Sequence, residues 1–203
     1  ILVRKLMKYT VNCFIWRKDL SPMKKIDNFS EVLCAGKSKT LVDPKSEVNA
    51  KIYIKAKDDL KLVNVDHALI NQSIDTKKCD FMVLGINSNK THMIELKGTN
   101  IEEAFKQISN TIEYLFHDPQ LNYCVILREV LDAYIASPER QKVPNIPSTR
   151  EKELAKKLVR GNKHKPDNIF DLIHFVKVVK NQRKAAQSGR QIIISGRVPL
   201  ELD

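Results

Sequence analysis

Residues 79–98 read CDFMVLGINSNKTHMIELKG, two apolar strands around a polar turn. A half-buried strand normally alternates apolar and polar residues, but these two place full charges among apolar neighbours. Asp80 begins the first strand, and Glu95 and Lys97 end the second. Because the strands of a hairpin run antiparallel, the beginning of one meets the end of the other. We therefore expect these three charged side chains to lie together.

The simplest register places the centre of the turn between Ser88 and Asn89. Asp80 then lies opposite Lys97 and diagonally from Glu95, and alternation along a strand puts all three on one face. Opposed Cβ atoms are about 4.5–5.5 Å apart and diagonal ones about 7–8 Å. Two carboxylates at that separation can both reach one Mg²⁺, whose oxygen ligands lie at about 2.0–2.1 Å. The hairpin thus predicts a divalent-metal site.

The residues nearest the three charges are apolar on both faces of the hairpin. We expect one face to pack on the core, and it holds Phe81, Val83, Ile94 and Leu96. On the face of the charged residues, the neighbours are Met82, Leu84 and Met93. The alternative is an ordinary amphipathic hairpin with a solvated Asp–Lys pair. The apolar neighbours argue against it, because charges at the edge of a buried face cost free energy unless they are paired or bound to a metal.

The sequence after the hairpin predicts a helix that begins after Asn100. Asn100 is a good N-cap, and two glutamates in the first turn suit the positive end of the helix dipole. Asp118 and Pro119 end the helix. Its apolar residues recur at helical spacing, namely Ile101, Phe105, Ile108, Ile112 and Leu115. Buried strands are expected at 123–127 and 132–137.

The rest of the chain predicts further strands and two basic helices. Strands are expected at 9–16, 51–57 and, near the end, 191–198, with turn-rich residues at 21–28 and 36–46. Residues 60–70 fit either a strand ending near Asp66 or a strand followed by a helical turn. The helices are expected at 150–161, capped by Ser148 or Thr149, and at 167–184. We therefore expect a core at 1–137 and a basic helical extension at 138–203, packed on the same domain.

Charge is concentrated in that C-terminal third. The net charge is +11, and residues 140–203 contain 15 Lys and Arg against 6 Asp and Glu. This predicts a polyanionic partner, most simply nucleic acid, although a merely solvated basic surface is the alternative. The candidate phosphate contacts are Lys156, Lys157, Arg160, Lys163, Lys165, Arg183 and Lys184.

Composition also bounds where the protein acts. Four scattered cysteines without a C-x-x-C pair predict reduced core residues rather than a disulfide framework or a zinc site. No apolar run is long enough to span a membrane, and charges interrupt the apolar residues at the start of the sequence too often for a signal peptide. We expect a cytoplasmic or nucleoid-associated protein with no membrane partner.

Asp80, then fourteen residues, then Glu95-Leu96-Lys97 resembles the signature of the PD-(D/E)XK nuclease superfamily. The resemblance covers residues 60–137 and includes the passage from hairpin to helix. It implies an α/β protein with a restriction-endonuclease-like core, in which helices flank a mixed β-sheet. Cys79 stands where a proline often precedes the aspartate, and the upstream acidic residue of many members is not obvious.

The resemblance also implies roles for individual residues. Asp80, Glu95 and the backbone carbonyl of Leu96 would hold Mg²⁺. We expect Mn²⁺ to be able to substitute for Mg²⁺ at this site. Lys97 would orient the attacking water, and Gln107 stands where some branches keep a glutamine near the site. The candidates for the upstream acid are Asp66, Glu47 and Glu31, and Asp66 is favoured because it is nearest the hairpin in the sequence.

These expectations together describe a metal-dependent nuclease that acts on DNA rather than RNA. One alternative is a non-catalytic nucleic-acid-binding or assembly module that keeps the fold. Retention of Asp80, Glu95 and Lys97 argues against it, because decayed sites usually lose at least one such residue. The other alternative is a structural or adaptor protein whose charges are incidental. The sequence leaves a homodimer open.

Overall fold

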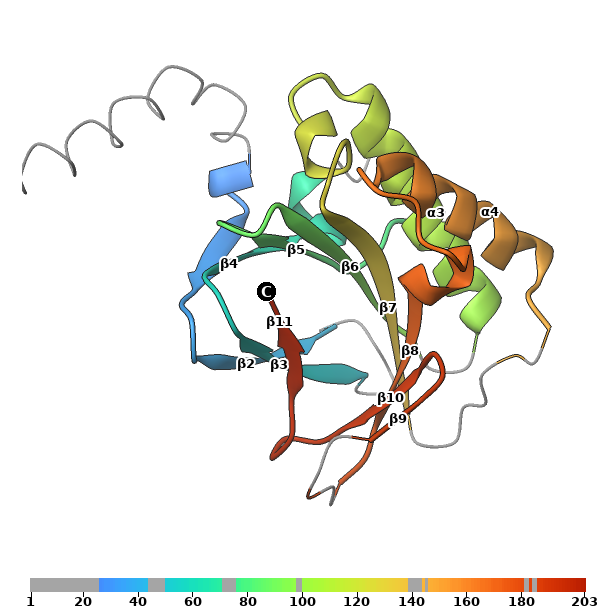
Figure 1. Ribbon diagram of the computed structural model, residues 1–203. Coiled ribbons are helices and arrows are strands. Elements are labelled where there is room, and N and C mark those ends of the chain that lie inside the picture. Colours follow the sequence, from blue (N-terminus) through green and yellow to red (C-terminus); the bar gives the residue numbers. More distant parts are fainter. Residues whose placement is uncertain are drawn as a thin grey trace, which may run out of the picture.

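The protein is an α/β structure in which two helices and a small sheet cover the two faces of a larger sheet (Figure 1). The computed structural model describes residues 26–43, 50–70, 76–97, 100–138, 144, 146–180, 183 and 186–203. None of the helices within these residues is both long and apolar enough to cross a membrane.

The larger sheet has eight strands and is mixed. Antiparallel pairs join its first four strands, parallel pairs join the next three to them, and an antiparallel pair adds the last. In spatial order the strands are β1 (Ser30–Leu33), β4 (Leu60–Asn64), β5 (Phe81–Gly85), β6 (Lys90–Leu96), β7 (Val130–Pro138), β8 (Ile173–Val178), β10 (Gln191–Ile194) and β9 (Ala186–Ser188).

The helices make the two connections between the parallel strands β6, β7 and β8. Helix α3 (Ile101–His117) links β6 to β7, and α4 (Thr149–Gly161) links β7 to β8. Both were predicted, and their caps are Asn100 and Ser148, whose side chains accept from the backbone amides three residues later. The apolar residues of α3 pack with α4 and one face of the sheet in a single core cluster. The two helices thus cover one face of the parallel part of the sheet.

The second sheet covers the opposite face of the larger one. It contains β11 (Leu200–Leu202), β3 (Lys51–Ala56) and β2 (Ser38–Val42) in that order. The predicted strand at 51–57 is confirmed as β3, whereas residues 36–46, expected to be turn-rich, contain β2. Ile52 and Ile54 of β3 pack against Val83 and Ile94 of the larger sheet, so both faces of the β5–β6 hairpin are buried.

The register of the hairpin differs from the expected one by two residues. Phe81 pairs with Ile94 and Met82 with Met93, so the turn is centred between Asn87 and Ser88. Asn89 has a φ of 53°, which places a left-handed residue just after the turn. A shift of two residues changes the partners but not the faces, because side chains alternate with a period of two. The charged side chains therefore keep their common face.

Residues 123–127 do not form the expected strand. They are buried in part beneath the helices, but Asn122–Cys124 is a 3₁₀ turn, and Leu127 has a φ of 52° that prevents extended pairing. The chain then enters β7 at Val130, so the strand expected at 132–137 is confirmed with wider bounds.

The helix expected at 167–184 is also wrong. A 3₁₀ turn at Ile169–Leu172 leads into β8, which is bound in parallel between β7 and β10. Phe175 enters the core beneath the helices and Val176 the core beneath the small sheet. This alternation suits a strand that is buried on both faces, a pattern that cannot be told from a buried helix by sequence alone. The C-terminal third is thus one helix followed by strands, not a helical extension.

Two other expectations concern the ends of strands. Residues 60–70 form a strand followed by a helical turn, which is the second of the two expected alternatives. The strand β4 ends at Asn64, and a π-helical turn follows at Val65–Leu69. The strand expected near the end of the sequence is β10, but it is followed by β11, which joins the other sheet. The strand predicted at 9–16 lies outside the described residues.

Candidate metal and catalytic site

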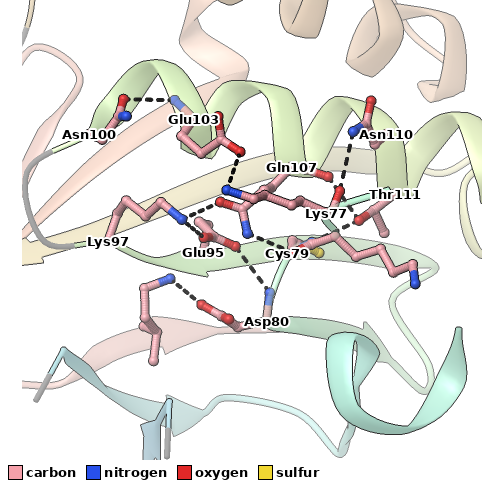
Figure 2. Close-up of polar contacts among 12 residues, drawn as sticks. Lys77, Cys79, Asp80, Glu95, Lys97, Asn100, Glu103, Gln107, Asn110 and Thr111 are labelled. Carbon is pink, nitrogen blue, oxygen red and sulfur yellow. Dashed lines mark hydrogen bonds and ion pairs between the residues drawn. The ribbon is translucent and has the colours of Figure 1, made fainter. Parts of the chain in front are cut away.

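The charged residues of the hairpin lie together beneath α3 (Figure 2). Asp80 immediately precedes β5, and Glu95 lies near the end of β6. The observed register, continued by one residue, places Asp80 directly opposite Glu95 rather than diagonally from it. The backbone amide of Asp80 donates to Oε2 of Glu95 at 3.1 Å. The two candidate metal ligands are therefore closer partners than the sequence predicted.

Both carboxylates are held by donors yet keep lone pairs available. Oδ2 of Asp80 accepts from the backbone amide of Leu96 at 2.7 Å, and Oε1 of Glu95 accepts from Nζ of Lys97 at 3.1 Å. A carboxylate has about four lone-pair sites, so neither group is saturated. Leu96, whose carbonyl was the third expected ligand, thus lies beside Asp80.

The electrostatics of the pair favour a bound cation. Burial raises the pKa of Asp80 to about 7, and the charges of Asp43 and Asp66 add to this, against the opposing hydrogen bond from Leu96. Burial and the charge of Asp80 raise the pKa of Glu95 well above its usual value, although Lys97 acts in the opposite direction. Two adjacent buried carboxylates that resist ionisation are stabilised as anions by a divalent cation. The residues present therefore fit Mg²⁺ or Mn²⁺.

Lys97 is coupled to the carboxylates and to α3. Its ammonium group donates to Glu95 and to Oε1 of Gln107, while the side chain remains 22% exposed. Gln107 is itself buried, and its Nε2 donates to the backbone carbonyl of Lys78 at 2.9 Å. Gln107, expected to border the site, thus contacts Lys97 directly and also fixes the chain just before Asp80.

A third ligand is not assembled by the described residues. They contain no group of three or more His, Cys, Asp and Glu side chains placed to hold a metal ion. Asp66 lies in the π-helical turn after β4 and is close enough for its charge to affect Asp80. Glu31 forms an ion pair with Lys39 on β2, and Glu47 lies outside the described residues.

Asp43 was missed by sequence reasoning. It follows β2, and its charge contributes more than that of Asp66 to raising the pKa of Asp80. Nothing in the sequence links it to the hairpin, since it follows a strand of the other sheet and belongs to no recognisable motif. Only the packing of the small sheet against the larger one brings the two carboxylates within electrostatic range.

The predicted basic residues differ in how available they are. Lys156, Lys165 and Arg183 are exposed, whereas Lys157 forms an ion pair with Glu113 at 3.2 Å and Lys163 one with Glu129 at 2.8 Å. The guanidinium group of Arg160 lies 4.4 Å from the ring centroid of Phe116. Lys184 lies outside the described residues. Part of the predicted surface is thus used in intramolecular contacts.

Another basic group lies nearer the carboxylates. Lys77 forms an ion pair with Glu103 of α3 at 3.3 Å. Burial is the largest single influence on the pKa of Glu103 and raises it, but the hydrogen bond from Lys77 and the charges of Lys77, Lys106 and Lys97 together outweigh it and lower that pKa. Lys77 and Lys106 are exposed, so two cationic side chains lie near Glu103 on the helix that covers the carboxylates. The sequence analysis gave them no role, because they are not part of a dense basic run.

Comparison with known proteins adds no family assignment, since no family model, curated protein or solved structure matches the chain.

Proposed function

We propose that the protein is a metal-dependent nuclease that hydrolyses phosphodiester bonds, with Asp80, Glu95 and Lys97 as its catalytic residues. The observation that carries the proposal is the hydrogen bond between Asp80 and Glu95 in a buried setting that raises both pKa values. A pair of buried acids without a cation is destabilising, so its presence calls for a ligand of opposite charge. A lysine that contacts the same pair adds the group that phosphodiester hydrolysis needs.

The arrangement of elements supports a restriction-endonuclease-like core. The hairpin β5–β6 carries the acids, α3 crosses the sheet, and β7 returns parallel to β6. This is the order that the PD-(D/E)XK resemblance implies.

The chain's own residues would divide the chemistry between them. Asp80 and Glu95, with the backbone carbonyl of Leu96, would hold the metal ion, which supplies Lewis acidity and lowers the pKa of bound water. Lys97 is partly exposed and held by Glu95 and Gln107, so its ammonium group can orient a water and stabilise negative charge on the phosphate. Arginine could not easily exchange a proton in this position, whereas lysine can.

The charge distribution supports nucleic acid as the substrate, and we propose DNA rather than RNA. Lys77 and Lys106 beside the site, and Lys156 and Lys165 farther along the chain, are exposed cations that suit phosphate contacts. The net charge of +11 favours association with a polyanion.

The deciding experiment incubates the purified protein with Mg²⁺ or Mn²⁺ and labelled duplex, single-stranded and branched DNA and RNA. We expect metal-dependent cleavage by the wild type, loss of cleavage in Lys97→Ala with Mn²⁺ binding retained, and normal cleavage in the control Lys55→Ala. Lys55 is a partly exposed lysine in the small sheet that also pairs with a glutamate. Equal cleavage by wild type and Lys97→Ala would refute the site. Nucleic-acid binding without cleavage would instead support the non-catalytic alternative.

A further inference from the structure

The segment that leads to Asp80 is held by a row of polar side chains on α3. Residues 77–79 lie outside any strand, so no sheet ladder fixes their position. Instead, Nδ2 of Asn110 donates to the Lys77 carbonyl at 3.2 Å, Nε2 of Gln107 donates to the Lys78 carbonyl at 2.9 Å, and Oγ1 of Thr111 accepts from the Cys79 amide at 2.9 Å. Three consecutive residues are thus bound to one face of the helix (Figure 2).

Thr111 is the most buried member of this row. It is fully inaccessible to solvent, and its hydroxyl also donates to the backbone carbonyl of Gln107 at 3.0 Å. The hydroxyl therefore has a fixed orientation, with its proton toward the helix and a lone pair toward Cys79. Cys79 is bonded directly to Asp80, so Thr111 contacts the peptide next to a candidate metal ligand without contacting the site itself.

The contact between Thr111 and Cys79 matters because a metal ligand such as Asp80 must be positioned precisely. Mg²⁺ demands near-ideal octahedral geometry at about 2.0–2.1 Å and tolerates little displacement of its ligands. Glu95 is held by the ladder of β6, whereas Asp80 precedes β5. Its carboxylate accepts from the Leu96 amide, its backbone bonds to Glu95 and Val65, and the segment before it is held by α3. The relative position of the two carboxylates thus depends on α3 as well as on the hairpin.

We propose that Thr111 is a positioning residue that sets the affinity of the Asp80–Glu95 pair for a divalent cation. Its hydroxyl fixes the Cys79 amide and thereby the carboxylate of Asp80, and Asn110 supports the same segment two residues earlier, at Lys77. The proposal rests on the metal site of the proposed function.

The test compares two identical deletions of a buried hydroxyl. Thr111→Val removes the contact to Cys79, while Thr91→Val is the matched control. Thr91 is equally inaccessible, and its Oγ1 donates to the Cys124 carbonyl at 2.7 Å at the other end of β6. Mn²⁺ dissociation constants are measured by calorimetry on the full chain, with thermal unfolding followed in parallel. Thr111→Ser, which keeps the hydroxyl, is the rescue variant.

We expect Thr111→Val to weaken Mn²⁺ binding about tenfold or more, because groups that orient metal ligands typically contribute 10–100-fold to affinity. Thr111→Ser should bind nearly as the wild type does. Thr91→Val should lose a comparable amount of thermal stability but bind Mn²⁺ normally. Asn110→Ala, at a half-buried position, should also weaken Mn²⁺ binding. It replaces Thr111→Val as the test variant if the valine variant does not fold.

The outcomes separate this proposal from the one on which it rests. Wild-type Mn²⁺ affinity in Thr111→Val, or in Asn110→Ala where the valine variant does not fold, overturns the positioning role and leaves the metal site intact. A wild type that binds no Mn²⁺ overturns the metal site and, with it, the role of Thr111. Equal weakening in Thr91→Val would show that the loss follows general destabilisation and would also overturn the proposal.

Discussion

The backbone amide of Asp80 donates to Oε2 of Glu95, so the start of β5 and the end of β6 are joined by one of the carboxylates that the hairpin brings together. The contact fixes the two acidic groups side by side, where the charge of Asp80 adds to burial in raising the pKa of Glu95. In the absence of a cation this arrangement lowers the free energy of unfolding at neutral pH. The size of this destabilisation can be measured.

Asp80→Asn is expected to stabilise the metal-free protein at pH 8. The pKa of Asp80 is raised from 3.8 to about 7, so the folded state holds a proton that the unfolded state has lost between these values. Stability therefore falls as pH rises across this window. Each pKa unit corresponds to about 1.4 kcal/mol, which gives a gain on the order of 2–4 kcal/mol for the amide. The amide oxygen can still accept from Leu96.

Thermal unfolding in a chelating buffer measures this effect. Because about 1 kcal/mol shifts the midpoint by about 2–4 °C in a protein of this size, Asp80→Asn should unfold roughly 5–15 °C higher than the wild type at pH 8. The difference should shrink as the pH falls through this window, and the two should converge only at about pH 4 and below, near the unfolded pKa of 3.8. Asp167→Asn, at an exposed aspartate, is the control and should change little at either pH. A variant less stable than the wild type at pH 8 would contradict the raised pKa.

Mn²⁺ affinity is expected to increase with pH. The metal binds the ionised carboxylates, and protons compete for them while the pH is below the raised pKa values. Raising the pH from 6 to 8 should therefore tighten Mn²⁺ binding. For each carboxyl proton that the metal displaces, the affinity should rise about tenfold per pH unit as long as the pH is below the pKa of that carboxyl group. Calorimetry in two buffers of different ionisation enthalpy should also detect proton release. A dissociation constant independent of pH would show that the carboxylates are already ionised.

The hairpin, α3 and the shared face of Asp80, Glu95 and Lys97 could be predicted because they follow from local patterns. Alternation with a period of two fixed the face even though the register was wrong by two residues, since only an odd shift would have moved the charges to the other side. The turn itself offered no such constraint, because several adjacent polar residues could occupy its centre.

The errors arose where tertiary contacts outweigh local pattern. Residues 173–178 are apolar enough for a buried helix, and only the neighbouring strands β7 and β10 make them a strand. Of residues 123–127, Tyr123, Cys124 and Val125 are apolar because they join the core without pairing in a strand, whereas Ile126 and Leu127 are exposed. Asp43 reaches the site through packing of the small sheet, which no motif in the sequence encodes.

Nucleic-acid binding is expected to depend more on Lys77 and Lys106 than on the predicted basic helix. Both are exposed, and their charges act on Glu103 of α3, whose pKa is also lowered by the charge of Lys97. Lys77→Glu and Lys106→Glu should each weaken binding of a labelled oligonucleotide and reduce the slope of log K against log salt by about 1. Lys156→Glu, at an exposed position on α4, is the comparison and should have a smaller effect. The opposite ranking would place the nucleic acid along α4.

The last prediction concerns a buried charge cluster on the face of β6 opposite the site. Asp132 of β7 lies 2.7 Å from Nδ1 of His92 and 3.5 Å from Nε2 of His174. Burial alone would raise the pKa of Asp132, but the charge of His92 and the hydrogen bonds of the histidines outweigh it and lower that pKa. Burial likewise disfavours the imidazolium of His92, yet Asp132 raises the pKa of that ring above 6.5. The pair is thus charged in the folded state at mildly acidic pH.

Asp132→Asn is therefore expected to destabilise the protein most between about pH 4 and 6.5. The contribution of His92 is fully present below its unfolded pKa and is lost as the pH rises through the higher folded value. That of Asp132 is present above its unfolded pKa and is lost only in stronger acid. Urea unfolding at pH 5.5 should show a loss of about 3 kcal/mol, because one partner of a buried ion pair remains without the other. The imidazolium of His92 is lost as the pH rises through its raised folded pKa, so the difference should be smaller at pH 9 than at pH 5.5. An equal loss at both pH values would show that hydrogen bonding alone joins the two residues.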